Sequence, residues 1–189
     1  MKEKVRCTWC QKDAIYIEYH DKEWGHPVHD DQKLFEFLVL ESFQAGLSWL
    51  TVLKKRDNFR KAFANFDAKK VAKFDKKKFD ELMQDAGIIR NRLKIEAAIN
   101  NAACYLQIQK EFGSFDKYVW SFVGHKPIVN KRKGLGDIPP RTDISDAMSK
   151  DMGKRGFKFR GSTICYAFMQ AVGMVDDHVN DCWKKSKKV

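Results

Sequence analysis

Two cysteines and two histidines at opposite ends of the chain constrain its fold most strongly. Cys7 and His20 lie near the beginning, and His178 and Cys182 lie near the end. The last two are four positions apart, so a helix over this segment presents both side chains on one face. Two thiolates and two imidazoles suit a tetrahedral Zn²⁺ ion, and four protein ligands leave no coordination position for a reacting water. We therefore expect a structural zinc ion that joins the termini of one domain.

Spacing alone leaves a second set of ligands open. Cys10 follows Cys7 at the C-x₂-C spacing that many zinc sites use, and two further imidazoles, His26 and His29, lie close in the sequence. The alternative ligands are Cys7, Cys10, His178 and Cys182. Both sets join the two termini, so they make the same prediction for the fold.

The composition indicates one folded domain over residues 1–189. Hydrophobic residues make up 43% of the chain and include 14 Phe and 5 Trp, which excludes a disordered polymer. No apolar run is long enough to span a membrane, and the first residues lack the apolar core of a signal peptide. Five cysteines are an odd number, which favours a reducing compartment. We expect a cytoplasmic monomer with no membrane partner.

The charge favours a polyanionic partner. Lys and Arg exceed Asp and Glu by 36 − 25 = 11 residues. In a chain with many aromatic residues, the commonest partner of this kind is nucleic acid, although a basic surface that only maintains solubility gives the same count.

Apolar residues recur mostly with helical periodicity, and alternating strand patterns are scarce, so we expect an all-α fold. The first expected helix begins after Asp30-Asp31 and ends near Gly46, and the second runs from Trp49 into Lys54-Lys55-Arg56. Shorter helices are expected after Asp67 and Asp75, and another helix is expected after Ser114. Further helices are expected over 91–112, near 144–154 and over 162–172. The stretch 124–142 is rich in Gly, Pro and basic residues, and it is expected to form an irregular loop.

Glu41 is the most unusual residue for its position. The helical angle places it in the centre of an apolar stripe, between Leu38 and Ala45. A buried carboxylate must be paired, hydrogen-bonded or protonated, and such groups are enriched at functional sites. A carboxylate with a purely structural role is the alternative.

Aromatic residues surround this region of the sequence. Tyr16, Tyr19 and Trp24 lie on either side of His20, and Trp49 follows the helix that carries Glu41. Clustered Trp and Tyr are normally part of a core. Beside a carboxylate, however, their faces also bind a flat, electron-poor ring such as a methylated, cationic purine.

The segment 156–163 contains a glycine-rich turn between two expected helices. Gly156 and Gly161 allow close approach of a phosphate, Lys158 adds positive charge, and Ser162 and Thr163 lie at a helix N-terminus with free N–H groups. Such contacts position a duplex without reading its sequence. An ordinary corner between two helices is the alternative.

Several segments in the same order now resemble one family. They read YHDKEWG at 19–25, LESFQAGLSW at 40–49, DAGIIRNR at 85–92, VWSFV at 119–123, RGFKF at 155–159 and DHV at 177–179. Together they resemble the constitutive bacterial 3-methyladenine DNA glycosylases (type I) across nearly the whole chain.

The resemblance implies a fold and a set of site residues. It implies an all-α fold of the helix–hairpin–helix glycosylase superfamily, with the hairpin motif at about 144–172 and one structural zinc ion. The zinc ligands would be Cys7, His20, His178 and Cys182, with Cys10 left out. The base pocket would contain Glu41 with Tyr19, Trp49, Tyr16, Trp24 and Trp9, and the contacts to alkylated double-stranded DNA would involve Gly156, Lys158, Gly161, Ser162 and Thr163.

The implied reaction is hydrolysis of the N-glycosidic bond of 3-methyladenine, which releases the free base and leaves an abasic site in an uncut strand. Glu41 is expected to recognise the base and to favour its positive charge. A zinc-stabilised DNA-binding module without catalysis is the main alternative. A zinc hydrolase with Glu41 as general base is a second one, and it requires an exchangeable water on the metal.

Overall fold

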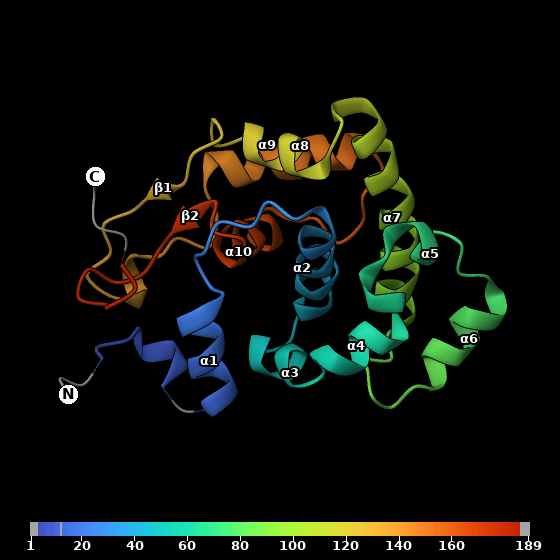
Figure 1. The fold of residues 1–189 in the computed structure, drawn as a ribbon, viewed down its shortest axis with the longest axis horizontal. Coiled ribbons are helices and arrows are strands. Elements are labelled where there is room, and N and C mark those ends of the chain that lie inside the picture. Colours follow the sequence, from blue (N-terminus) through green and yellow to red (C-terminus); the bar gives the residue numbers. More distant parts are fainter. Residues whose placement is uncertain (1–3, 12, 186–189) are drawn as a thin grey trace.

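The protein is described by a computed structural model that covers residues 4–11 and 13–185. The described residues are mostly helical, as expected (Figure 1). The α-helices are α1 (Ala14–Lys22), α2 (Asp31–Gln44), α3 (Trp49–Lys54), α4 (Arg56–Ala62), α5 (Ala68–Val71), α6 (Lys76–Gln84), α7 (Arg92–Phe112), α8 (Phe115–Ser121), α9 (Asp143–Lys154) and α10 (Ser162–Ala171). Short 3₁₀ turns lie at Thr8–Cys10, Ala64–Phe66 and Leu135–Asp137.

Local capping explains where most helices begin. A side-chain oxygen at the N-cap accepts a hydrogen bond from a backbone N–H of the first turn in most of them. The capping residues are Asp13, Asp30, Ser48, Asp67, Asp75, Asn91, Ser114 and Thr142. The predicted helices after Asp30, Ser48, Asp67, Asp75 and Ser114 are confirmed, whereas α1 was not predicted and α4 was not predicted as a separate helix.

Helix α2 forms the centre of the molecule. Residues 34–43 are all buried along it, and it contacts α3, α7, α8 and α10. Figure 1 shows α2 between α10 and α7. A helix buried on all sides needs a reason to carry a carboxylate, and Glu41 lies within this buried run with 3% of its surface exposed.

The irregular segment 124–142 contributes a small parallel ladder. Strand β1 (Ile128–Val129) pairs with β2 (Val175–Asp176), with Ile128 opposite Val175. This ladder ties the loop to the chain that follows α10. Within the described residues, no helix combines the length and the apolar character that a membrane span needs.

Residues 177–182 do not form the helix that would place His178 and Cys182 on one face. After β2 the chain continues in an irregular path, because its backbone groups find partners outside a helix. The carboxylate of Asp176 accepts the N–H of His178 at 3.0 Å, and the N–H of Asn180 donates to the carbonyl of Arg132 at 2.7 Å. His178 and Cys182 are therefore positioned by a loop and not by one helix face.

Residues 155–161 connect α9 and α10, which confirms the predicted turn between two helices. Gly156 adopts φ +86°, a left-handed conformation that glycine allows at little cost. The turn delivers the chain to the beginning of α10 at Ser162, where Gly161 is the N-cap residue.

Candidate active site

A cavity of about 380 Å³ lies between α1, α2, α3 and α10. Its walls contain all six residues that the sequence assigned to a base pocket. They are Trp9, Tyr16, Tyr19, Trp24, Glu41 and Trp49. The tertiary structure thus brings residues from four segments of the chain to one place.

The aromatic rings form a continuous wall. Trp9 meets Tyr16 edge-on at a centroid distance of 4.9 Å, and it meets Trp24 at 5.1 Å. Tyr19 and Trp49 lie 5.5 Å apart with their planes tilted by 51°. Such contacts between rings hold each ring in place, so the wall is rigid enough to select a flat ligand.

Glu41 is the one carboxyl group among the residues that line this cavity. Burial raises its pKa to about 8, and its Oε2 atom has no hydrogen-bond partner among the described residues. The Nε1 atom of Trp49 is also buried without a partner among them. Buried polar atoms are nearly always hydrogen-bonded in folded proteins. Two unpaired ones at the same cavity indicate a place for a polar ligand.

Lys94, on α7, binds the end of α2 next to this cavity. Its Nζ donates to the carbonyl of Phe43 at 2.8 Å and to that of Ala45 at 2.5 Å. These carbonyls lie at the end of α2, where a positive charge is favourable. Lys94 is buried, and burial lowers its pKa. Lys94 thereby holds the turn that separates Glu41 from Trp49. This role of Lys94 was not predicted from the sequence.

Part of the cavity lining was not predicted from the sequence. The additional lining residues are Gln44, Leu135, Ile138, Pro139, Pro140, Ala167 and Gln170. Four of them belong to the irregular loop 124–142. Its Pro-Pro pair was a signal of rigid local structure, but only the folded chain shows that this loop lies against the pocket.

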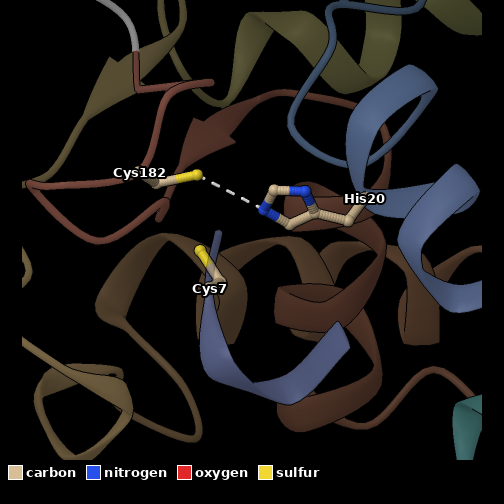
Figure 2. A group of neighbouring side chains, drawn as sticks. All are labelled: Cys7, His20 and Cys182. Atoms are coloured by element: carbon tan, nitrogen blue, oxygen red, sulfur yellow. Dashed lines mark hydrogen bonds between the residues drawn. The ribbon is translucent and has the colours of Figure 1, made fainter. Parts of the chain in front are cut away.

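Three of the four predicted metal ligands form a cluster. The ligand atoms of Cys7, His20 and Cys182 all lie within 4.8 Å of one another, and all three residues are buried (Figure 2). The Sγ atom of Cys182 lies 3.4 Å from the Nε2 atom of His20. Burial raises the pKa of Cys7 to about 12, and a bound cation would favour the thiolate instead.

His178 lies beside this group but is not a member of it. Its ring centroid is 5.0 Å from that of His20, and its Nε2 atom is buried without a partner among the described residues. Both imidazoles contact a carboxylate through Nδ1, Asp21 for His20 and Asp176 for His178. A carboxylate on Nδ1 leaves Nε2 free to bind a metal, which is the usual arrangement of zinc-binding histidines.

Cys10 is not in the cluster. Its Sγ atom donates to the carbonyl of Cys7 at 3.1 Å. His26 and His29 are also outside, and His29 stacks on Trp120 at 4.5 Å. Of the two ligand sets that the sequence left open, the geometry fits the set that contains His20.

The predicted DNA-contacting residues lie together at the turn before α10. Gly156, Lys158, Gly161 and Thr163 are exposed, and Ser162 is half-buried. The buried amide of Asn101 holds this turn, since it donates to the carbonyl of Lys158 at 2.9 Å and accepts its N–H at 2.8 Å.

The turn is also connected to the base pocket. The hydroxyl of Ser42, the neighbour of Glu41 on α2, lies 2.8 Å from the carbonyl of Leu38 and 3.3 Å from that of Phe159, so its one proton serves both acceptors. The segment expected to contact phosphates therefore lies against the helix that carries the pocket carboxylate.

Comparison with known proteins reveals close relatives. The family model described as methyladenine glycosylase matches residues 9–185. The DNA-3-methyladenine glycosylase of Haemophilus influenzae is 55% identical over 178 residues, which is 94% of this chain and 96% of the relative. DNA-3-methyladenine glycosylase 1 of Escherichia coli is 55% identical over 177 residues, with 94% and 95% covered.

Solved structures agree with these relatives. A crystal structure of 3-methyladenine DNA glycosylase I has a TM-score of 0.94 and 48% identity, and the match covers 96% of this chain and all of that one. A variant of 3-methyladenine DNA glycosylase I in complex with 3-methyladenine has a TM-score of 0.94 and 40% identity, with 97% and 99% covered.

Proposed function

Since the chain belongs to the methyladenine glycosylase family, we propose that it removes 3-methyladenine from alkylated double-stranded DNA in base-excision repair. It hydrolyses the N-glycosidic bond and releases the free base. The observation that carries the site assignment is the cavity itself, where the unpaired carboxyl group of Glu41 lies among aromatic walls.

The damaged nucleotide must leave the duplex to reach this cavity. Flipping a base out costs a few kcal/mol, and less for a damaged base, which already gives some selectivity. We assign stacking on the purine ring to Trp49, a contribution of about 1–3 kcal/mol per base. Tyr19 offers a hydrogen bond from the wall, and Trp9, Tyr16 and Trp24 complete the surface against which the ring packs.

Glu41 recognises the base through charge and hydrogen bonding. In the cavity without a ligand its carboxyl group is held neutral, since burial raises its pKa to about 8. A cationic 3-methylated purine favours the ionised form, because an opposite charge nearby stabilises a carboxylate. The ionised group then accepts hydrogen bonds from the donor edge of the adenine.

The alkylated base needs little acid catalysis. When a water oxygen bonds to the sugar C1′, the bond from C1′ to the base nitrogen breaks, and its electron pair neutralises the positive charge of the purine. The proton of the attacking water passes to solvent, and the sugar–phosphate strand stays intact. Glu41 has no second carboxyl group beside it among the residues that line the cavity, so we assign it to recognition and not to a pair of acid and base.

The residues Cys7, His20, His178 and Cys182 fit one structural zinc ion. The cluster of three buried ligand atoms and the unpaired Nε2 atom of His178 support this proposal. Bound there, zinc supplies a cross-link between the two ends of the chain. With four protein ligands it offers no position for a reacting water.

We assign the phosphate contacts to the turn before α10. Lys158 is exposed there, and the first N–H groups of α10 have no side-chain cap at Gly161. An uncapped helix N-terminus favours an anion. Together with Gly156, Ser162 and Thr163, this turn is proposed as the hairpin of a helix–hairpin–helix motif. The net charge of +11 agrees with a DNA substrate, and we expect a cytoplasmic monomer.

Incubation with duplex DNA treated with a methylating agent tests the function. We expect free 3-methyladenine in the supernatant and strands that break only after alkaline treatment, which cleaves abasic sites. If folded, zinc-loaded protein binds the duplex in a salt-dependent manner and releases no base, the chain is a DNA-binding module and the proposal fails.

A further inference from the structure

Asp177 is a buried carboxylate that receives four hydrogen bonds. Its Oδ1 atom accepts from Asn130 Nδ2 and from Arg132 Nε, both at 2.8 Å. Its Oδ2 atom accepts from the hydroxyl of Tyr166 at 2.6 Å and from Gln170 Nε2 at 2.9 Å. The residue has none of its surface exposed. A carboxylate with four donors around it acts only as an acceptor.

This arrangement decides which end of the Gln170 amide faces Asp177. An amide group has a donor end and an acceptor end, and they are often hard to tell apart. Here chemistry assigns them, because only the NH₂ end of Gln170 makes a favourable contact with an ionised carboxylate. The carbonyl oxygen Oε1 therefore points away from Asp177. Gln170 lines the same cavity as Glu41.

We infer that Gln170 is a specificity-determining residue that presents a fixed hydrogen-bond acceptor to the flipped base, and that Asp177 is the positioning residue that holds it. The inference rests on the proposed function. An adenine carries an exocyclic amino group at C6, which donates to such an acceptor. A guanine carries an oxygen there, and two facing acceptors repel each other. Unpaired polar groups of this kind are a strong means of rejecting a wrong substrate.

The substitution Asp177→Asn should reverse the amide of Gln170. Arg132 and Asn130 keep an oxygen at the Oδ1 position, because both are donors. The NH₂ group that the substitution introduces then occupies the Oδ2 position and faces Gln170. The Gln170 amide turns its carbonyl toward this introduced NH₂ group and its own NH₂ group toward the pocket, where it favours the oxygen of a guanine.

Two further variants separate positioning from general damage. Tyr166→Phe removes the other donor to the same Oδ2 atom but leaves the Gln170 contact intact, so it is the matched control. Gln170→Leu removes the acceptor, while Asp177 keeps its three other donors and the fold is maintained.

The experiment compares 3-methyladenine with 3-methylguanine. We would measure binding of each free base by quenching of tryptophan fluorescence, and release of each from methylated duplex DNA by chromatography. The readout is the ratio of the two bases, since a partly unfolded variant lowers both signals equally. We expect the preference for the adenine to fall about three- to tenfold in Gln170→Leu, the factor that one hydrogen bond contributes. It should fall further in Asp177→Asn and stay unchanged in Tyr166→Phe.

The possible failures are distinguishable. If the unsubstituted protein releases no 3-methyladenine, the proposed function itself fails. In a second outcome, the unsubstituted protein releases the base while all three variants keep the same ratio of 3-methyladenine to 3-methylguanine. In that case Gln170 does not select the substrate and this inference is wrong. A ratio that falls equally in Tyr166→Phe and Asp177→Asn also overturns it, because it shows a general structural effect.

Discussion

Replacing Glu41 with Gln should make the stability of the fold less dependent on pH. The ordinary pKa of a glutamate is 4.5, and burial raises that of Glu41 to about 8. Between these values the folded protein keeps a proton that the unfolded chain has released. The free energy of unfolding of the unsubstituted protein therefore falls as the pH rises through this window. The contribution is most favourable below pH 4.5, and its loss is complete above pH 8.

The size of the effect follows from the same two pKa values. They differ by about 3.5, and each unit corresponds to 1.36 kcal/mol, so the loss between pH 4.5 and 8 is at most about 5 kcal/mol. Water that enters the cavity when Glu41 ionises reduces this figure. Glutamine has the same shape and carries no charge at any pH. The Glu41→Gln protein should thus become more stable than the unsubstituted protein, and by a growing margin, as the pH rises.

Urea denaturation at pH 5, 6.5 and 8 measures this margin. All other titrating groups are common to the two proteins and cancel in the difference. Glu36→Gln is a control for which the expected change in stability has the opposite sign. Burial alone raises the pKa of Glu36, but the charge and hydrogen bond of Arg56 lower it overall below its ordinary value. That variant should be less stable than the unsubstituted protein by an amount that stays constant from pH 5 to 8.

A difference between Glu41→Gln and the unsubstituted protein that does not change with pH would refute this reasoning. It would mean that Glu41 is ionised in the empty cavity. Its role in binding a cationic base would then involve no change of protonation.

Four further predictions concern activity, base binding and metal content. Glu41→Gln should lose most excision of 3-methyladenine while it still folds and binds zinc; a metal-free or unfolded variant would contradict the division between pocket and zinc site. Trp49→Ala should weaken binding of the free base by about 1–3 kcal/mol, measured by calorimetry, and unchanged affinity would assign the stacking to another ring. Cys182→Ser should lower both the zinc content, measured by mass spectrometry, and the melting temperature. Cys10→Ser should leave zinc bound, and loss of zinc from it would favour the alternative ligand set.

Features that depend on neighbouring residues were predictable from the sequence. Asp30, Ser48 and Ser114 cap helices because their side chains bond to N–H groups three positions later, and that contact is local. Glu41 was found for a similar reason, since helical periodicity alone places it on an apolar face. Tyr16, Tyr19, Trp24 and Trp49 were found as an aromatic cluster in the sequence, Trp9 was added by the family resemblance, and the structure gathers all five around one cavity.

The path of the chain around the zinc site was not predictable in this way. Helical spacing of His178 and Cys182 suggested a helix, but the segment forms a loop. Its N–H groups pair with Asp176 and with Arg132, and the latter lies 48 residues away from its partner Asn180. Long-range pairing overrode the local pattern.

The sequence alone determined the family, most of the helices and the carboxylate of the pocket, because each of these depends on short stretches of chain. Only the tertiary structure decided what surrounds that carboxylate. Lys94 of α7 bonds to Phe43, 51 positions away, and Asp177, which orients Gln170, is itself held by Asn130, 47 positions away. Such contacts form when helices pack, and no spacing along the chain encodes them. The orientation of one amide, set by a buried carboxylate, is therefore visible only in the folded protein.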